Sequence, residues 1–202
     1  ANSVATAALD MDNDNVEALM ETEVSGSTLE ATRQAMVAKI GENIQVRRMS
    51  ARGGDDTKTV GSYIHMGKIG VLVELEGASE EVAVDIAMHV AAMNPAYATQ
   101  DDVPAEEIEK ERAILLAQVE DSGKPPEIME KMVDGRIRKY LEEICLVSQT
   151  FVKTNDKTVG QLIKDAGGKM IGFTRVEVCE GIETKEDDFA AEVAKMAGGD
   201  YA

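Results

Sequence analysis

The chain has 202 residues and a formal net charge of −17 at pH 7. A chain of this length buries roughly 70% of the surface that its unfolded form exposes, so a packed core needs neither a disulfide nor a metal. The negative charge repels phosphate backbones, and a chain with no tryptophan and three phenylalanines has few rings for stacking bases, so direct nucleic-acid binding is disfavoured.

Hydropathy and cysteine spacing indicate the compartment. No stretch approaches the roughly 18 uninterrupted apolar residues that a membrane-spanning helix needs, and the N-terminus lacks a charged-then-apolar signal pattern. Cys145 and Cys179 lie far apart and form no CxxC pair, which argues against a disulfide framework or a zinc site and favours two small core hydrophobes. We expect a cytoplasmic protein without a membrane partner.

The first forty residues have helical spacing. Residues 25–28 offer an N-cap, and a helix is predicted from Leu29 to Ile40, ending at Gly41 because glycine commonly caps helix C-termini. Before it, apolar side chains recur at steps of three or four around a polar break, namely Val4, Ala8, Val16, Leu19 and Met20.

Alternating side chains then predict strands. A strand is expected over residues 43–49, followed by a polar loop, and two more are expected at 60–65 and 69–76, joined by a short glycine-containing turn. In the last of these, one face is apolar, whereas Glu74 and Glu76 on the other face are expected to be solvated.

Capped helical stretches follow. Ser79 is predicted to cap a helix that ends at residues 94–95, and its apolar stripe should cover the sheet. Charged helices ending at about Glu120 and Ile144, separated by a glycine–proline break, predict a helical hairpin. Its facing residues are expected to be Ile108, Leu115, Val119, Ile128, Met132, Ile137, Leu141 and Ile144.

The remaining elements are shorter. After a loop at 147–153, a short helix is predicted from Thr158 to the glycines at 167–168. The last strand, at 170–178, alternates imperfectly, so it should be covered on both faces or bulged. Residues 187–196 have the pattern of a small amphipathic helix that includes Phe189.

The residue types that carry catalysis give little signal. His89 lies beside an apolar helical stripe without a nucleophile or metal-ligand spacing, so a histidine at the edge of the core is favoured over catalysis. The many carboxylates fit solvated helix faces, and no glycine motif fits a phosphate-binding loop. We therefore predict no catalytic residue, no metal ligand and no cofactor.

Uncharged loop residues suggest protein docking instead. Ile40 and Gly41 end a helix, His65 ends a strand beside a turn, and Phe151 and Val152 lie between helices. An exposed Phe-Val pair is costly to leave in water unless it folds back or meets a partner.

Several blocks of sequence together resemble one family. They are KIGENI (39–44), SYIH (62–65), IGVLV (69–73), IAMHVAA (86–92), SGKP (122–125), IMEKMV (128–133), FV (151–152), TVGQL (158–162) and DFAAE (188–192). In this order and with few gaps, they resemble the core and C-terminal region of bacterial elongation factor Ts.

The resemblance implies an α+β fold with small, mainly antiparallel sheets covered by helices, two related core subdomains and a protruding antiparallel helical hairpin. By position, residues 1–52 would be a partial N-terminal core subdomain, and residues 58–100 with 146–183 a C-terminal core subdomain. Residues 101–145 would be the hairpin, of the coiled-coil or dimerisation type, and residues 184–202 a C-terminal helical module.

The resemblance also implies a function. Elongation factor Ts is a guanine-nucleotide exchange factor that binds elongation factor Tu, in its GDP-bound and nucleotide-free forms, and promotes GDP release without covalent chemistry. Ile40, Gly41, His65, Phe151, Val152 and Phe189 match or adjoin family positions that contact this partner.

One departure leaves an alternative open. The family's N-terminal three-helix domain and its Thr-Asp-Phe-Val motif are not present in this sequence, so we expect a fragment or one chain of a divided protein that binds better than it exchanges. The alternative is a binding or self-association module, such as a homodimer, without exchange activity.

Overall fold

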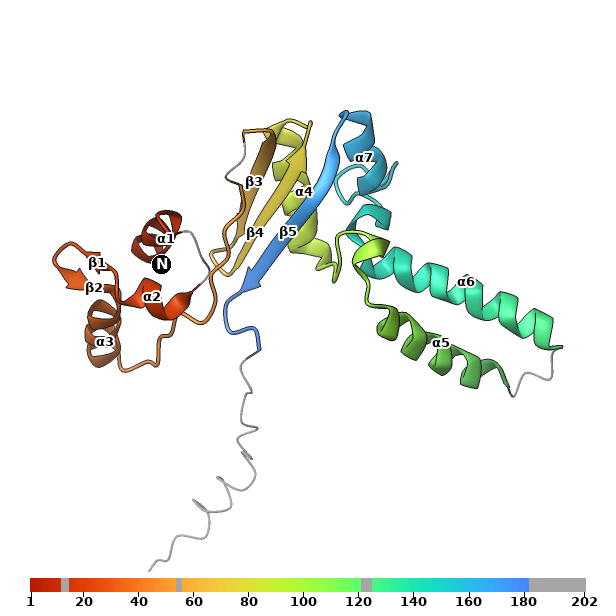
Figure 1. The fold of residues 1–202 in the computed structure, drawn as a ribbon, viewed down its shortest axis with the longest axis horizontal. Coiled ribbons are helices and arrows are strands. Elements are labelled where there is room, and N and C mark those ends of the chain that lie inside the picture. The colour runs from red at the N-terminus through yellow and green to blue at the C-terminus, as the bar shows by residue number, and fades with distance from the viewer. Residues whose placement is uncertain (12–14, 54–55, 121–124, 182–202) are drawn as a thin grey trace, which may run out of the picture.

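The computed structural model describes residues 1–11, 15–53, 56–120 and 125–181. At its centre is an antiparallel sheet with strand order β3-β4-β5, built from Lys58–His65, Ile69–Glu76 and Lys169–Glu177. Helix α4, Glu80–Met93, lies along one face of this sheet (Figure 1). The predicted α+β class with small antiparallel sheets is confirmed.

The β3–β4 hairpin forms where the alternating pattern predicts it. Its turn uses two left-handed residues, Met66 at φ 50° and Gly67 at φ 69°, and the Lys68 amide donates to the His65 carbonyl at 2.9 Å. The predicted strands are confirmed, although β3 begins two residues earlier than expected, at Lys58.

The main core lies between the sheet and α4. It contains Val71, Val73 and Leu75 from β4, residues of α4 that include Ile86 and Val90, and four residues from later in the chain, namely Leu146, Phe151, Val159 and Ile163. Ser79 caps α4 at its start and Asn94, in the left-handed region, ends it, as predicted. The apolar stripe predicted for this helix consists of Val82, Ile86, Val90 and Met93, and of these Met93 remains exposed.

Gly61 sets the approach of α4 to the sheet. It pairs with Val73 on the face that the helix covers. A Cβ added at Gly61 would overlap the backbone of Ala83 and Val84 and lie 2.6 Å from Ala83 Cβ. Only glycine fits at this crossing of strand and helix.

The last strand is bulged. Its register changes between the pairs Glu74↔Gly172 and Leu75↔Met170, which leaves Ile171 without an opposite residue. An extra residue of this kind reverses the alternation. This confirms the predicted irregularity, and the short helix before β5 is confirmed as α7, Val159–Asp165, capped by Thr158.

The outer face of the sheet contains an unexpected buried charge. Glu74 is only 5% exposed and lies 3.7 Å from Arg52 and 3.5 Å from Lys58. Arg52 also donates to the Phe173 carbonyl at 2.9 Å and to Thr174 Oγ1 at 3.0 Å. The predicted solvation is therefore wrong for Glu74, because the segment before β3 folds over this face, whereas Glu76 is exposed as expected.

The N-terminal part forms a separate small core. Helices α1, α2 and α3 are Asn2–Leu9, Val16–Met20 and Leu29–Ile40, as the spacing predicts. Thr28 caps α3 and Gly41, at φ 79°, ends it. A two-residue hairpin, β1 Glu23–Val24 with β2 Ser27–Thr28, was not anticipated from the sequence.

The strand predicted over residues 43–49 is absent. Among the described residues, no other segment pairs with it, and an extended chain without a neighbour makes no ladder. Arg33 donates to the Ile44 carbonyl at 2.8 Å, and Val46 and Met49 pack against the small N-terminal core. Side chains therefore hold this segment in place of a sheet.

Helices α5, Ala105–Glu120, and α6, Pro126–Ile144, form the predicted hairpin, which projects from the sheet domain (Figure 1). Short 3-10 turns, η1 Gln100–Asp102 and η2 Leu146–Ser148, adjoin it. Leu115, Val119, Val133 and Ile137 are buried in its seam. Ile128, predicted to face the seam, is exposed because it lies about 100° around the helix from Met129, which packs there.

Two tyrosines fix the root of the hairpin. Tyr97 and Tyr140 donate to the two carboxylate oxygens of Glu107 at 2.5 and 2.7 Å. These bonds lower the pKa of Glu107 and raise the pKa of Tyr140 to about 12. Within the described residues, no helix combines the length and apolarity required to cross a bilayer.

The crossing at Gly61 generates a stability prediction. Gly61→Ala should lower the free energy of unfolding by about 2 kcal/mol or more, because the new methyl group has to displace α4. Gly135→Ala is the control: nothing lies within 4 Å of its added Cβ in α6, so it should raise stability by about 0.5–1 kcal/mol. Urea unfolding measures both changes, and equal effects would contradict this account of the crossing.

The missing strand generates a second prediction. Amide hydrogen exchange of residues 43–49 should be much faster than that of residues 69–76, because none of the former amides donates to a backbone carbonyl among the described residues. The measurement is made on a dilute sample, where a second copy cannot supply the missing neighbour. Equal protection of the two segments would contradict it.

Candidate functional site

The uncharged loop residues lie on three different elements. Ile40 and Gly41 end α3 and are exposed, His65 ends β3, and Val152 lies between η2 and α7. The two surface grooves described below include Val152 and the neighbours of His65, but not Ile40. The structure therefore places these residues at separate positions and does not gather them into one cleft.

His65 adjoins exposed apolar residues in the sequence, but its side chain lies on the other face of β3 from that of Ile64, beside Tyr63. Its Nδ1 is 3.2 Å from the Tyr63 hydroxyl, and its sequence neighbours Ile64 and Met66 are exposed, Met66 by 84%. With two exposed valines of the β5 end, these residues form the hairpin patch, which we define as Ile64, Met66, Val176 and Val178. An exposed apolar patch of this kind is typical of a protein contact surface.

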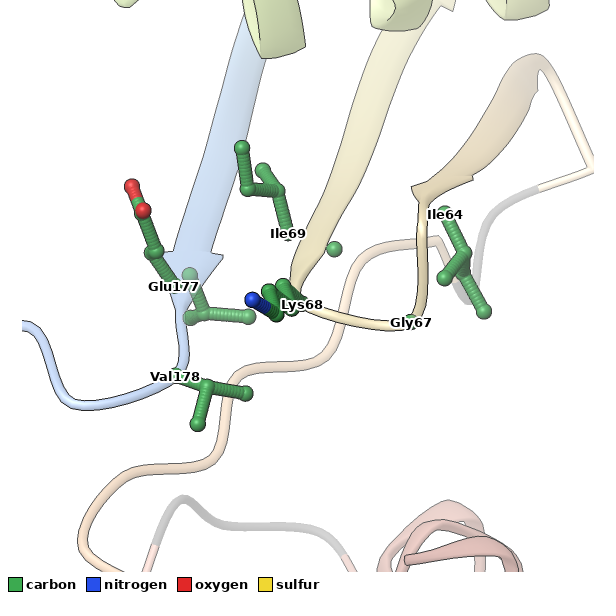
Figure 2. A pocket seen from close by; sticks show the side chains of 8 residues that line it. Ile64, Gly67, Lys68, Ile69, Glu177 and Val178 are labelled. Carbon is green, nitrogen blue, oxygen red and sulfur yellow. The ribbon is translucent and has the colours of Figure 1, made fainter.

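A shallow groove runs through the hairpin patch. Ile64, Gly70 and Val176 are paired across the three strands, and Gly70 leaves the row open between the two larger side chains. Figure 2 shows Ile64 on one side of the groove, Val178 and Glu177 on the other, and Lys68 and Ile69 between them. The missing side chain of Gly70 therefore creates the groove.

A second groove surrounds Val152. It lies where the C-terminal ends of α4 and α6 meet the segment after η2, and Met93 and Val152 are its exposed apolar side chains. We call it the loop groove; its lining is Met93, Lys139, Glu142, Glu143, Ser148, Gln149, Thr150, Val152 and Asn155.

The predicted exposure of the Phe-Val pair is confirmed for Val152 and wrong for Phe151. Val152 is 39% exposed, but Phe151 is only 2% exposed and belongs to the main core. The Phe151 amide donates to the Lys157 carbonyl at 2.9 Å, and the Asn155 amide donates to the Phe151 carbonyl at 2.8 Å. The second bond closes a turn over residues 151–155, in which Phe151 enters the core and anchors the loop while Val152 lines the groove.

Beneath the loop groove lies a histidine whose partners sequence reasoning missed. His89 is fully buried rather than at the edge of the core. The Val152 amide donates to its Nδ1 at 3.2 Å, its Nε2 lies 3.0 Å from Gln149 Oε1, and Gln149 Nε2 donates to the Glu143 carbonyl at 2.6 Å. Burial lowers the pKa of His89, with the bond to Gln149 acting in the opposite direction.

A signal for this contact exists in the sequence. Asp85, His89 and Met93 are four residues apart, so they share one side of a helix. Lys153 pairs with Asp85 at 3.0 Å, which brings the same loop to the same side of α4. The spacing alone does not say which segment covers it.

Other predicted features have mixed outcomes. Cys145 is buried, and burial raises the pKa of its thiol, but Cys179 is exposed at φ 68°, so the expectation of a core cysteine is wrong there.

Phe189 and the predicted helix at 187–196 lie outside the described residues. In the part of the chain that the structure describes, no three His, Cys, Asp or Glu side chains are grouped so that they could hold a metal ion.

The fold and these surfaces fit a protein-binding scaffold: a helix-covered sheet with a projecting helical hairpin and exposed apolar side chains. Comparison with known proteins gives the family. The family model "Elongation factor TS" matches residues 1–180. The chain belongs to the elongation factor Ts family of translation factors, which confirms the resemblance.

Relatives are similar over nearly the whole chain. Elongation factor Ts of Alkalilimnicola ehrlichii is 53% identical over 199 residues, and that of Thioalkalivibrio sulfidiphilus is 51% identical over 199 residues; each match covers 98% of this chain and 68% of the relative. Elongation factor Ts of Halorhodospira halophila is 48% identical over 193 residues, covering 96% of this chain and 66% of the relative. The chain thus spans about two thirds of the length of these relatives.

The opposite orientations of Phe151 and Val152 generate a prediction. Phe151→Ala should lower the free energy of unfolding by about 3–5 kcal/mol, because it empties a core position. Val152→Ala should change it by about 0.5 kcal/mol, as expected for a largely exposed side chain. Urea unfolding of both variants measures the difference, and similar losses would show that Phe151 is not the anchor.

Proposed function

We propose that this chain binds elongation factor Tu, in its GDP-bound and nucleotide-free forms, and promotes the release of GDP during translation elongation in the cytoplasm. Membership of the elongation factor Ts family supports the proposal. The structural observation that carries it is the exposure of Ile40, His65 and Val152 on ordered elements, with Val152 in one surface groove and Ile64, the neighbour of His65, in the other. Such surfaces bind proteins, and the activity requires no nucleophile or metal.

The mechanism is thermodynamic coupling. A protein that binds the empty form of a G protein more tightly than the GDP form must weaken GDP by the same factor. Couplings of this kind typically amount to about 1–3 kcal/mol, a factor of roughly 5–150 in affinity. The chain therefore needs only contacts that differ between the two forms of its partner.

We assign the contacts by their resemblance to family positions and, within the described residues, by exposure. Ile40 and Gly41, the His65 turn with the hairpin patch, and Val152 in the loop groove would touch the partner. Phe151 would contribute by holding its neighbour in place, since it is itself buried. Phe189, in the proposed C-terminal module at residues 184–202, would add a further contact.

The same proposal divides the chain into working parts. Residues 1–52 would supply the Ile40 contact, and residues 58–100 with 146–183 would supply the other two. The hairpin at 101–145 projects from this body and would serve self-association into a homodimer. Exchange and self-association would thus use different surfaces.

Release of a fluorescent GDP from loaded elongation factor Tu tests the function. Faster release in the presence of the chain supports exchange. Complex formation without acceleration supports the alternative, a binding module. Failure to associate with nucleotide-free elongation factor Tu would overturn both.

Substitutions test the contacts. His65→Ala and Val152→Ala should each weaken the complex by roughly 1–3 kcal/mol, because each removes a central contact. Ile114→Ala is the control: Ile114 on α5 is as exposed as Ile40, 53% against 52%, but lies on the projecting hairpin. Affinity is measured by titration calorimetry, and unchanged affinity for both contact variants would remove these assignments.

A further inference from the structure

One side of α4 holds the segment that contains Val152. Lys153 pairs with Asp85, the Val152 amide binds His89, and Val152 shares the loop groove with Met93. These three helix residues are spaced by four, so they form one continuous row. The segment is therefore fixed along the helix at successive turns, with His89 in the middle.

The hydrogen bonds through His89 can run in only one direction. A backbone amide only donates, so Nδ1 must accept from Val152, which leaves the ring proton on Nε2. Nε2 then donates to Gln149 Oε1, and the amide group of Gln149 donates to the Glu143 carbonyl. Backbone groups at both ends thus fix the tautomer of His89 and the orientation of Gln149.

We propose that His89 is a positioning residue for partner binding, which holds the Val152 amide through Nδ1 and is itself oriented by Gln149. The inference rests on the proposed function for its role in binding, but the hydrogen bond can be tested on the free chain. His89 has no access to a partner because it is fully buried, so it acts only through Val152.

Few other side chains could replace it. The ring offers an acceptor towards Val152 and a donor towards Gln149 while it stays uncharged, as its burial requires. It also packs against the Phe151 ring, with centroids 5.9 Å apart. A single side chain therefore contacts Phe151, the anchor, and Val152, the exposed residue.

None of the charged side chains around this network that the structure describes is hydrogen-bonded to His89. On α4, Asp85 pairs with Lys153 from the loop. From α6, Lys139, Glu142 and Glu143 line the loop groove, and the backbone carbonyl of Glu143 accepts from Gln149. The direct polar partners of His89 are neutral, so its burial decides the pKa shift.

Protonation should release the segment. The pKa of His89 lies below its ordinary value of 6.5, so the ring is neutral and the bond to Val152 intact at neutral pH. The stability that this bond supplies is fully present above pH 6.5 and is lost as the pH falls through the lowered pKa, because a protonated Nδ1 cannot accept.

The experiment begins with the free chain. Amide exchange of Val152, followed by NMR, should be at least tenfold slower than expected for an exposed valine at pH 7. Imidazole nitrogen shifts should show the neutral Nε2–H tautomer. An unprotected Val152 amide or the other tautomer would overturn the inference whether or not elongation factor Tu binds.

Two near-isosteric variants then separate positioning from packing. The side-chain oxygen of Asn can occupy the place of Nδ1 and accept from Val152, and the side-chain nitrogen of Gln can occupy the place of Nε2 and donate to Gln149. His89→Asn should keep part of the Val152 protection and bind elongation factor Tu within about threefold of the unmodified chain. His89→Gln should lose the protection and bind at least tenfold more weakly. Val90→Ala, a core change in the same helix, is the matched control and should alter neither measurement.

The outcomes are distinguishable. If His89→Gln loses the protection but binds normally, the positioning role is wrong and the proposed function stands. If Val90→Ala weakens binding as much as His89→Gln, general loss of packing explains the effect and the positioning role is overturned. If the unmodified chain does not bind, the proposed function fails, and the role of His89 in binding that partner fails with it.

Discussion

The close crossing of β3 and α4 at Gly61 is the contact on which the rest of this structure depends. With no side chain at Gly61, the helix approaches the sheet closely enough for its backbone to lie against the strand. The β3–β4 turn then carries His65 at one end of the sheet, and α4 presents Asp85, His89 and Met93 to the segment after η2. Both candidate surfaces thus adjoin the same packed core of sheet and helix.

The exposure of each candidate surface depends on an adjacent residue: one that has no side chain at the hairpin patch, and one that is buried at the loop groove. At the hairpin patch, Gly70 leaves an open row between Ile64 and Val176. In the loop groove, Phe151 enters the core and Val152 is consequently turned outward. Exposed apolar side chains are held in one place by these arrangements, which lowers the conformational entropy that binding has to remove.

Two buried polar side chains show different ways to meet the penalty of burial. Glu74 keeps its position through ion pairs with Arg52 and Lys58, which tie the segment before β3 to the outer face of the sheet. His89 stays neutral and uses both ring nitrogens for hydrogen bonds. The ion pairs of Glu74 join two chain segments, whereas the hydrogen bonds of His89 fix the direction in which a chain of donors and acceptors runs.

Sequence by itself determined the features that depend on near neighbours. The caps of α3 and α4, the β3–β4 hairpin, the irregular β5 and the helical hairpin all follow from local spacing, and the family follows from the order of short motifs. Tertiary structure alone decided the burial of Phe151 and Glu74 and the partners of His89. These depend on residues distant in the chain, since Arg52 meets Glu74 and Gln149 meets His89 only after folding. Local periodicity shows on which face of a helix or strand a side chain lies, but only tertiary packing decides which segment covers that face.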